Sequence, residues 1–106
     1  MPAQKSHGAA SFGDLAPKLG QITDEVLFAD IWTRPQLSKR DRSLATVAAL
    51  VAMGRFAQLP FHLAFALENG LSAEELGELM THLAFYSGWP TAASGVGELA
   101  RILGEG

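Results

Sequence analysis

The sequence predicts an all-helical protein, and three observations support this fold class. Apolar side chains recur at helical spacing from about Asp14 onward. No stretch alternates apolar and polar residues as a half-buried strand would. Proline, serine and glycine fall at the ends of the apolar stretches, where they start and stop helices. We therefore expect a bundle of about five to six helices, with a flexible tail over residues 1–13 and a single domain over residues 14–106.

The first helical segment is expected between Pro17 and Trp32, because proline suits a first helical turn. One apolar stripe runs along it, formed by Leu19, Ile22, Val26 and Leu27. A glycine and a β-branched threonine inside the segment predict a break near residues 23–24. The residue before a proline is pushed out of helical geometry, so Pro35 ends the segment.

Two mostly apolar helices are expected next, over Lys39–Met53 and Ala57–Asn69, each closed by the glycine that follows it. Ser38 is a suitable N-cap for the first of them. That helix is apolar on nearly every side beyond its first turn, which predicts burial nearly all round. Pro60 is compatible with the second helix because it lies in the first turn.

The strongest helix start is at Ser72, because Glu75 completes a capping box three residues later. Four apolar residues form the stripe of this helix: Leu76, Leu79, Met80 and Leu83. A last helix is expected from Pro90 to about residue 103. Its predicted inward residues are Ala92, Val96, Leu99, Ala100 and Leu103. The small residues between positions 93 and 97 predict the close approach of another helix, since glycine otherwise weakens a helix by about 1 kcal/mol.

The composition predicts association between copies of the chain. Hydrophobic residues make up 48% of the 106 residues, and the mean hydropathy is +0.15. A chain of this size has little interior in which to bury so much apolar surface. We therefore expect a homo-oligomer, with the surplus apolar surface between subunits.

Charge and cysteine content exclude several classes of function. The net charge of -3 argues against a nucleic-acid partner. We expect no membrane association, because the longest apolar run is far shorter than the roughly 20 residues that a bilayer requires. The chain has no cysteine, which removes thiol redox chemistry and thiolate metal sites and suits a cytoplasmic protein. No metal site is expected from the three histidines, of which His7 lies on the tail.

His62 is the first candidate for catalysis. It lies in the middle of an apolar helix, and Gln58 precedes it by one turn. Burial disfavours a charged imidazole, so this histidine is suited to acid–base chemistry near neutral pH. The alternative is a core histidine that is hydrogen-bonded to a backbone or side-chain partner.

Arg42 is the second candidate, because it lies in the first turn of its helix, where positive charge opposes the helix dipole. Backbone N–H groups and a guanidinium together favour a carboxylate there. The alternative is pairing with an acidic side chain or simple solvation, and one of these is the expected state of Lys39 and Arg40.

His82 and Glu78 share a helical face, as residues four apart do. They form either a tuned pair or a solvated stripe. Tyr86 and Trp89 flank a glycine turn, where their rings either line a pocket or pack in a core or an interface.

The ordered set of motifs resembles the carboxymuconolactone decarboxylase family. The matching stretches are Asp24–Trp32, Leu37–Leu44, His62-Leu63-x-x-Ala66-Leu67-x-Asn69-Gly70, Ser72-x-Glu74-Glu75-Leu76-x-Glu78 and His82–Pro90. The resemblance implies an all-α fold shared with the alkylhydroperoxidase-D-like proteins. It also implies an obligate homo-oligomer, usually built from dimers or trimers and often hexameric, with pockets at subunit boundaries.

The thiol branch of that superfamily carries a Cys-x-x-Cys pair ahead of the histidine that His62 resembles. Arg55 and Gln58 occupy those positions here, so peroxide reduction by the thiol route is chemically excluded. The decarboxylase branch acts on a carboxylated muconolactone in aromatic catabolism without a cofactor, since the unsaturated lactone itself accepts the electrons freed as CO2 leaves.

By resemblance, Arg42 binds a carboxylate of a small carboxylic acid or lactone, and His62 transfers a proton. The substrate wall is assigned by resemblance to Gln58, His82, Tyr86 and Trp89. One alternative function is a non-catalytic helical oligomer that binds a small acid or a partner protein. Another is an antioxidant that works without thiols, which the sequence supports least.

Overall fold

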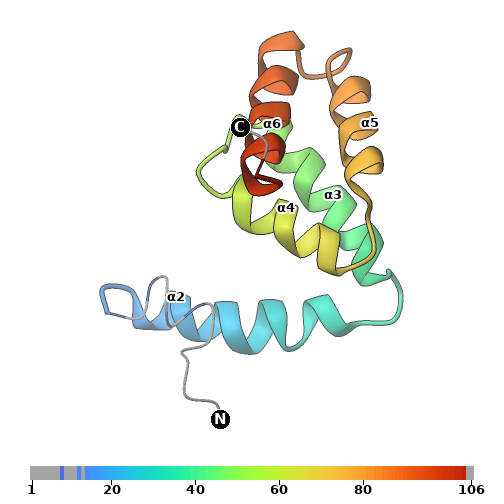
Figure 1. Ribbon diagram of the computed structural model, residues 1–106. Coiled ribbons are helices and arrows are strands. Elements are labelled where there is room, and N and C mark those ends of the chain that lie inside the picture. Colours follow the sequence, from blue (N-terminus) through green and yellow to red (C-terminus); the bar gives the residue numbers. More distant parts are fainter. Residues whose placement is uncertain (1–7, 9–11, 13, 105–106) are drawn as a thin grey trace. The chain divides into compact units, whose positions relative to one another are not determined.

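The computed structural model describes Gly8, Phe12 and residues 14–104, and these residues form helices and turns without any strand (Figure 1). The all-helical prediction is therefore confirmed. The chain divides into two compact units, residues 1–38 and residues 39–106. The tail expected over residues 1–13, His7 included, lies outside the described residues except at Gly8 and Phe12, and the single domain over residues 14–106 stays a prediction. No helix among the described residues is long and apolar enough to cross a bilayer.

The first unit contains α2 (Pro17–Ile22), the π-helical segment η1 (Thr23–Phe28) and the 3-10 turn η2 (Ile31–Thr33). The predicted break near residues 23–24 takes the form of a change from an α-helix to a π-helix. At this point the Thr23 hydroxyl donates a hydrogen bond to the Leu19 carbonyl at 2.7 Å. Farther along, the amide of Ala29 donates to the Asp24 carbonyl, five residues back, at 3.1 Å. The helix therefore widens without being interrupted.

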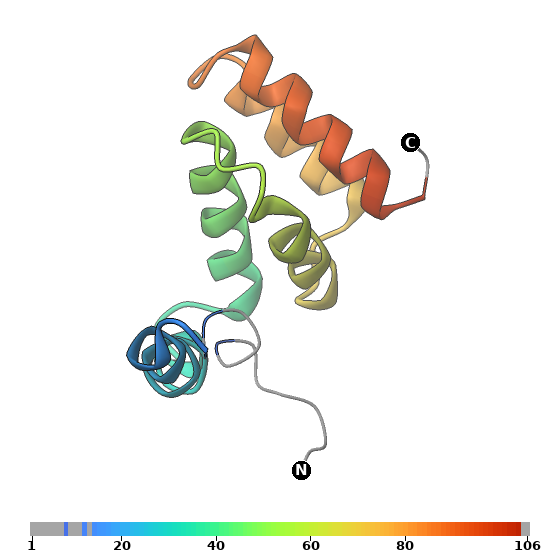
Figure 2. The ribbon, with the colours of Figure 1, turned by 90° about the vertical axis from the view of Figure 1, so that its left-hand side faces the viewer.

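The second unit contains α3 (Lys39–Ala52), α4 (Leu59–Glu68), α5 (Ala73–Leu83) and α6 (Trp89–Ile102). These bounds differ from the predicted ones by no more than two residues at any end. Consecutive helices form two hairpins, α3–α4 and α5–α6, and the second hairpin packs on the first through contacts of α6 with α3 and α4 and of α5 with α3 (Figure 2).

The core of this unit is formed by apolar side chains from all four helices. Its buried members are Val47, Val51, Leu59, Leu63, Ala66, Leu71, Leu76, Met80, Leu83 and Leu99. The prediction that α3 is buried nearly all round is wrong, because Ala45 and Ala49 are exposed and only Ser43, Val47 and Val51 are buried. Its neighbours in the unit cover one side of this helix, and alanine tolerates exposure at little cost.

The inward face of α6 differs from the predicted one. Ala92, Gly95 and Leu99 are buried, whereas 48% of Val96 and 38% of Leu103 are exposed. The sequence-based assignment of Val96 and Leu103 to the interior is therefore wrong. Gly95 faces inward in their place, and the next residue along a helix points about 100° away from it.

The close approach expected at the small residues of α6 occurs at Gly95. A Cβ atom at this position would lie 2.6 Å from the Met80 sulfur and 3.4 Å from a methyl carbon of Val51. A Cβ at Gly97, or at Gly77 on α5, would meet nothing within 4 Å. The contact with Met80 therefore explains the glycine at position 95 and not the other two.

The capping box predicted at the start of α5 is confirmed. The Glu75 amide donates to the Ser72 hydroxyl at 3.0 Å, and the Ser72 amide donates to one carboxylate oxygen of Glu75 at 2.9 Å. The other oxygen of Glu75 pairs with Arg40 of α3. The hydrogen bond from the Ser72 backbone and the Arg40 guanidinium together lower the pKa of Glu75 below its ordinary value of 4.5. One carboxylate thus caps α5 and links it to α3.

We expect Gly77→Ala to raise the free energy of unfolding by roughly 0.5–1 kcal/mol, because alanine favours a helix and the space is open. We expect Gly95→Ala to give no such gain, because Met80 must move. Its free energy of unfolding should be at least about 1 kcal/mol lower than that of Gly77→Ala. Urea midpoints of the two variants measure this difference. Equal stabilisation by both substitutions would contradict the tight contact at Gly95.

The lowered pKa of Glu75 predicts how stability depends on pH. A carboxyl group whose pKa is lower in the folded state contributes stability above its unfolded pKa, and loses that contribution as pH falls through the folded pKa. Glu75→Gln should therefore be less stable than the wild type near pH 7. The difference in free energy of unfolding between the two proteins should become smaller below pH 4.5. Urea titrations at a series of pH values test this, with Glu78→Gln as the control outside the capping box. A difference in stability that does not change with pH would refute the lowered pKa of Glu75.

Candidate functional site

A buried hydrogen bond fixes how α3 and α4 lie against each other. The Asn69 side-chain amide donates to the hydroxyl of Ser43, which is fully buried, at 3.0 Å. Because the helices are antiparallel, His62, seven residues before Asn69, lies level with about position 50 of α3. Arg42 is eight residues from that level, which corresponds to about 12 Å of helix. One hairpin therefore carries both main candidates at a fixed separation.

The His62 imidazole lies among aromatic rings. The Phe61 ring meets it edge-on, with centroids 4.9 Å apart, and the Phe65 ring lies at 6.4 Å. The two phenylalanine rings stack on each other at 5.6 Å. The residue as a whole is partly exposed, and its Nδ1 atom is buried. Gln58 is exposed at the N-cap position of α4, one turn before the histidine.

The Arg42 side chain is partly buried in the first turn of α3. Leu44 lines a hollow between α3 and α5. Residues 42 and 44 point about 160° apart around a helix, so Arg42 lies on the flank of α3 that faces away from this hollow. The carbonyl of Arg42 accepts a hydrogen bond from the Thr46 hydroxyl at 2.7 Å, one turn farther along.

The hollow between α3 and α5 has a volume of about 360 Å³. Its polar residues are Arg40, Glu75, Glu78 and His82, above an apolar surface of leucines. The His82 ring stacks on Tyr86, with centroids 4.8 Å apart and planes at 28°. His82 and Glu78 thus line one space, as their spacing predicted.

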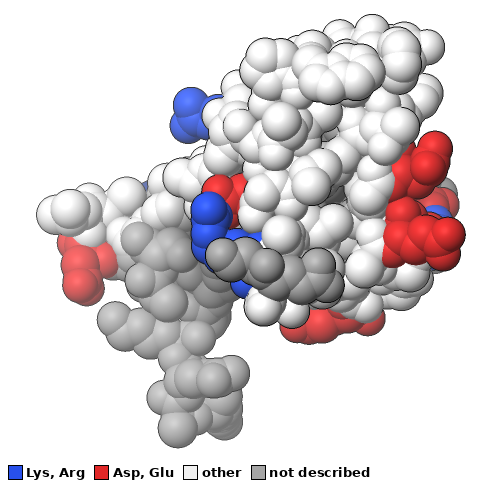
Figure 3. Space-filling model, turned by 45° about the horizontal axis from the view of Figure 1, so that its top comes forward, with Lys and Arg blue, Asp and Glu red and all other residues white. Residues whose placement is uncertain are grey.

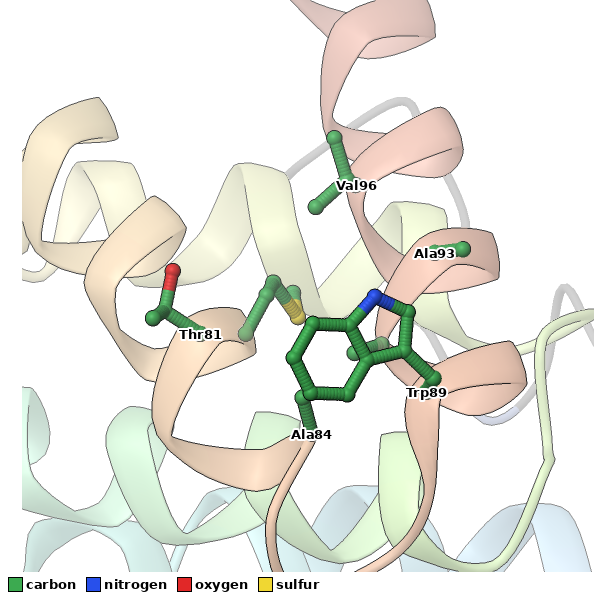
Figure 4. Close-up of a pocket in the computed structure, with 7 residues that line it drawn as sticks. Thr81, Ala84, Trp89, Ala93 and Val96 are labelled. Carbon is green, nitrogen blue, oxygen red and sulfur yellow. The ribbon is translucent and has the colours of Figure 1, made fainter.

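A smaller hollow of about 190 Å³ lies between α5 and α6. Figure 4 shows the Trp89 indole between Thr81 and Ala84 on α5 and Val96 on α6. The side chain of Trp89 is 65% exposed, and its ring meets Phe85 edge-on at 5.5 Å. The lining of this hollow is almost wholly apolar, with one hydroxyl and one indole N–H as its polar side-chain groups.

The structure thus places the candidate residues in three regions of residues 39–104. Gln58, His62 and Arg42 lie on the α3–α4 hairpin, whereas the residues described around the two hollows include neither His62 nor Arg42. Their catalytic roles stay predictions. Within the described part of the chain, no group of three or more His, Asp or Glu side chains is arranged to hold a metal ion.

Arg40 lines a hollow although its sequence pattern did not mark it as a site residue. It was expected to pair with an acid or to be solvated, and it pairs with Asp41, at 3.4 Å, and with Glu75. The same hollow contains His82. The spacing of Arg40 and Leu44, four residues apart on the flank that faces α5, is the signal that identifies it.

Comparison with known proteins is consistent with the helical architecture. Residues 17–100 match the model of the carboxymuconolactone decarboxylase family. The chain is 40% identical over 65 residues to a 4-carboxymuconolactone decarboxylase of Acinetobacter baylyi. The aligned stretch covers 61% of this chain and 48% of that protein. It is 30% identical over 71 residues to the nitrosuccinic acid decarboxylase npaB of Metarhizium robertsii. This aligned stretch covers 67% of this chain and 50% of that protein.

The chain spans about half the length of the curated relatives it matches. Both relatives are named as decarboxylases. The family match extends from the start of α2 almost to the end of α6, and so includes every helix described above from α2 onward. This chain therefore belongs to the carboxymuconolactone decarboxylase family.

Proposed function

We propose that this chain catalyses the loss of CO2 from a small carboxylic acid that carries its own electron-accepting group. The observation that carries the proposal is the α3–α4 hairpin, which holds Arg42, a partly buried residue, and the His62 imidazole among aromatic rings, about 12 Å apart along the helix. Membership of a family with two decarboxylase-named relatives supports the reaction type. The most direct candidate substrate is a carboxylated muconolactone of aromatic catabolism.

The names of the two relatives describe different acids that share one chemical property. A muconolactone is an unsaturated lactone, and nitrosuccinic acid is a dicarboxylic acid with a nitro group. In each, the bond to the leaving carboxylate breaks, CO2 departs, and the electron pair moves into the lactone system or the nitro group. Addition of a proton to carbon then completes the reaction. The substrate itself supplies the electron sink, so the step is balanced without a cofactor.

The protein has three tasks in this reaction: to bind carboxylate, to deliver the proton and to exclude water. Arg42 is assigned to the first task, since a guanidinium holds a carboxylate through two parallel hydrogen bonds. His62 is assigned to the second task. Phe61 and Phe65, which surround its ring, limit the access of water. Gln58, one turn away, can donate to a substrate oxygen.

The proposal assigns no chemical step to the other candidates. His82 and Tyr86 form one stacked pair beside the α3–α5 hollow, and Trp89 lines the α5–α6 hollow. Because Arg42 lies on the flank of α3 that faces away from the α3–α5 hollow, the proposed place of His82 and Tyr86 is the outer wall of the site of a neighbouring copy. Homo-oligomer formation, which the composition and the family resemblance predict, belongs with this proposal as the means of closing that wall.

Replacement of the proposed proton donor should slow turnover and leave the fold intact. We expect His62→Gln to lower kcat for a carboxymuconolactone by roughly 10²–10⁴-fold, the usual contribution of general acid–base catalysis. Release of CO2 and the circular dichroism of the same sample provide the measurement. Full activity of the folded variant would show that His62 is not the donor. Saturable binding of the acid to the wild type without CO2 release would identify a non-catalytic binder.

The two neighbouring arginines provide a matched test of carboxylate binding. Arg42→Gln should raise KM by roughly 10–100-fold, because a hydrogen bond to a charged group is worth about 1.5–3 kcal/mol. Arg40→Gln should leave KM within about twofold, since Arg40 is paired with acidic side chains beside the other hollow. Initial rates at several substrate concentrations give both values. If Arg40→Gln has the larger effect, the binding site is in the α3–α5 hollow.

A further inference from the structure

Helix α6 carries two apolar stripes on different sides. The first faces the core and contains Ala92, Gly95 and Leu99, which are buried. The second stripe is at least partly exposed along its whole length, and we call it the outer stripe; its residues are Trp89, Ala93, Val96, Ala100 and Leu103. Their spacing alternates between four and three residues, which is the pattern of a helix that packs along a second helix.

The outer stripe is nearly symmetric about Val96 in the sizes of its side chains. A large side chain stands at each end, a small one comes next on each side, and valine is at the centre. In an antiparallel pair of α6 helices centred on Val96, Trp89 of each copy meets Leu103 of the other, and Ala93 of each copy lies within one residue of the level of the other copy's Ala100. A stripe that complements itself in this way is the requirement for a two-fold interface. It spans about 21 Å of helix.

Charge favours a second copy over a charged partner. Residues 79–97 contain no Asp, Glu, Lys or Arg. Figure 3 shows the face at the α5–α6 end of the molecule without acidic or basic side chains, which gather elsewhere. The net charge of -3 opposes association of copies in general, and this uncharged face lets two copies meet without direct repulsion. Residues 79–97 offer no cation to an anionic lipid or a nucleic acid, and Arg101, farther along α6, is paired with Glu98.

Two further features of the same face suit close packing. The α5–α6 hollow of about 190 Å³ opens beside Trp89, Ala93 and Val96, and it has room for an apolar side chain from a partner helix. Gly97 lies on the exposed side of α6, and a Cβ there would meet nothing within 4 Å in its own chain. A small residue at this point lets another helix approach closely.

From these observations we propose that the outer stripe of α6 is a two-fold interface, in which the α6 helices of two copies pack antiparallel with Val96 at the axis. The inference concerns assembly and does not depend on the proposed decarboxylase activity. Its test therefore uses mass and cross-linking, which remain informative if no substrate is turned over.

Opposite charges at the axis give the sharpest test. We expect the wild type to sediment as a dimer or a multiple of it. Val96→Glu and Val96→Lys should each weaken this contact by at least about 100-fold, because each places two like charges at the axis. An equimolar mixture of the two variants should recover the assembly. Three results would each overturn the proposal: a monomeric wild type, unchanged assembly of both variants, or a mixture that fails to recover.

Cross-linking tests the same contact in a chain with a neutral substitution. The protein has no cysteine, so Val96→Cys introduces a single thiol. Two such thiols at a two-fold axis are within disulfide reach when the helices pack closely. Mild oxidation should give a covalent dimer, whereas Met53→Cys, at a position that is 64% exposed in the connection between α3 and α4, should not. Equal cross-linking of both variants, or of neither, would refute an axis at Val96.

Discussion

The hydrogen bond between Ser43 and Asn69 is the constraint on which the α3–α4 hairpin depends. Ser43 is fully buried, and its hydroxyl accepts a hydrogen bond from the side chain of Asn69, which directly follows α4, so sliding of α4 along α3 would break this bond. Apolar packing alone tolerates slippage, whereas a buried polar pair does not. The separation of Arg42 from His62 follows from this bond, and so does the surface on which the α5–α6 hairpin packs.

Much of the fold could be predicted from the sequence because its helix boundaries are encoded locally. Ser72 and Glu75 determine the start of α5 by their own hydrogen bonds, and proline begins α4 and α6. The facing of α6 could not be predicted in the same way. Its two sides are both apolar, and the choice between Gly95 and Val96 as the inward residue depends on the position of Met80 in another helix. Periodicity identifies the apolar stripes of a helix, but it does not show which of two stripes of similar hydropathy faces the core.

The candidate site shows the same division between local and tertiary information. Helical spacing was sufficient to group Glu78 with His82, and to place aromatic rings beside His62. It could not predict that His82 and Trp89 line separate hollows, because that depends on which neighbours α5 meets on each side. Arg40 is a second example. It pairs with Glu75, which lies thirty-five positions away, and the charges around Arg40 in the sequence do not indicate which distant acid it meets.

The π-helical segment has a consequence for how this chain can change during evolution. A π-turn is equivalent to an α-helix that has received one additional residue. Loss of a single codon between positions 23 and 28 would let the segment return to an α-helix, and the turns before and after it would keep about their present directions, because the wider π-turn already accommodates the additional residue. Insertions and deletions are usually tolerated in loops; here a helix offers a place where one codon can be lost while the faces on either side keep their directions.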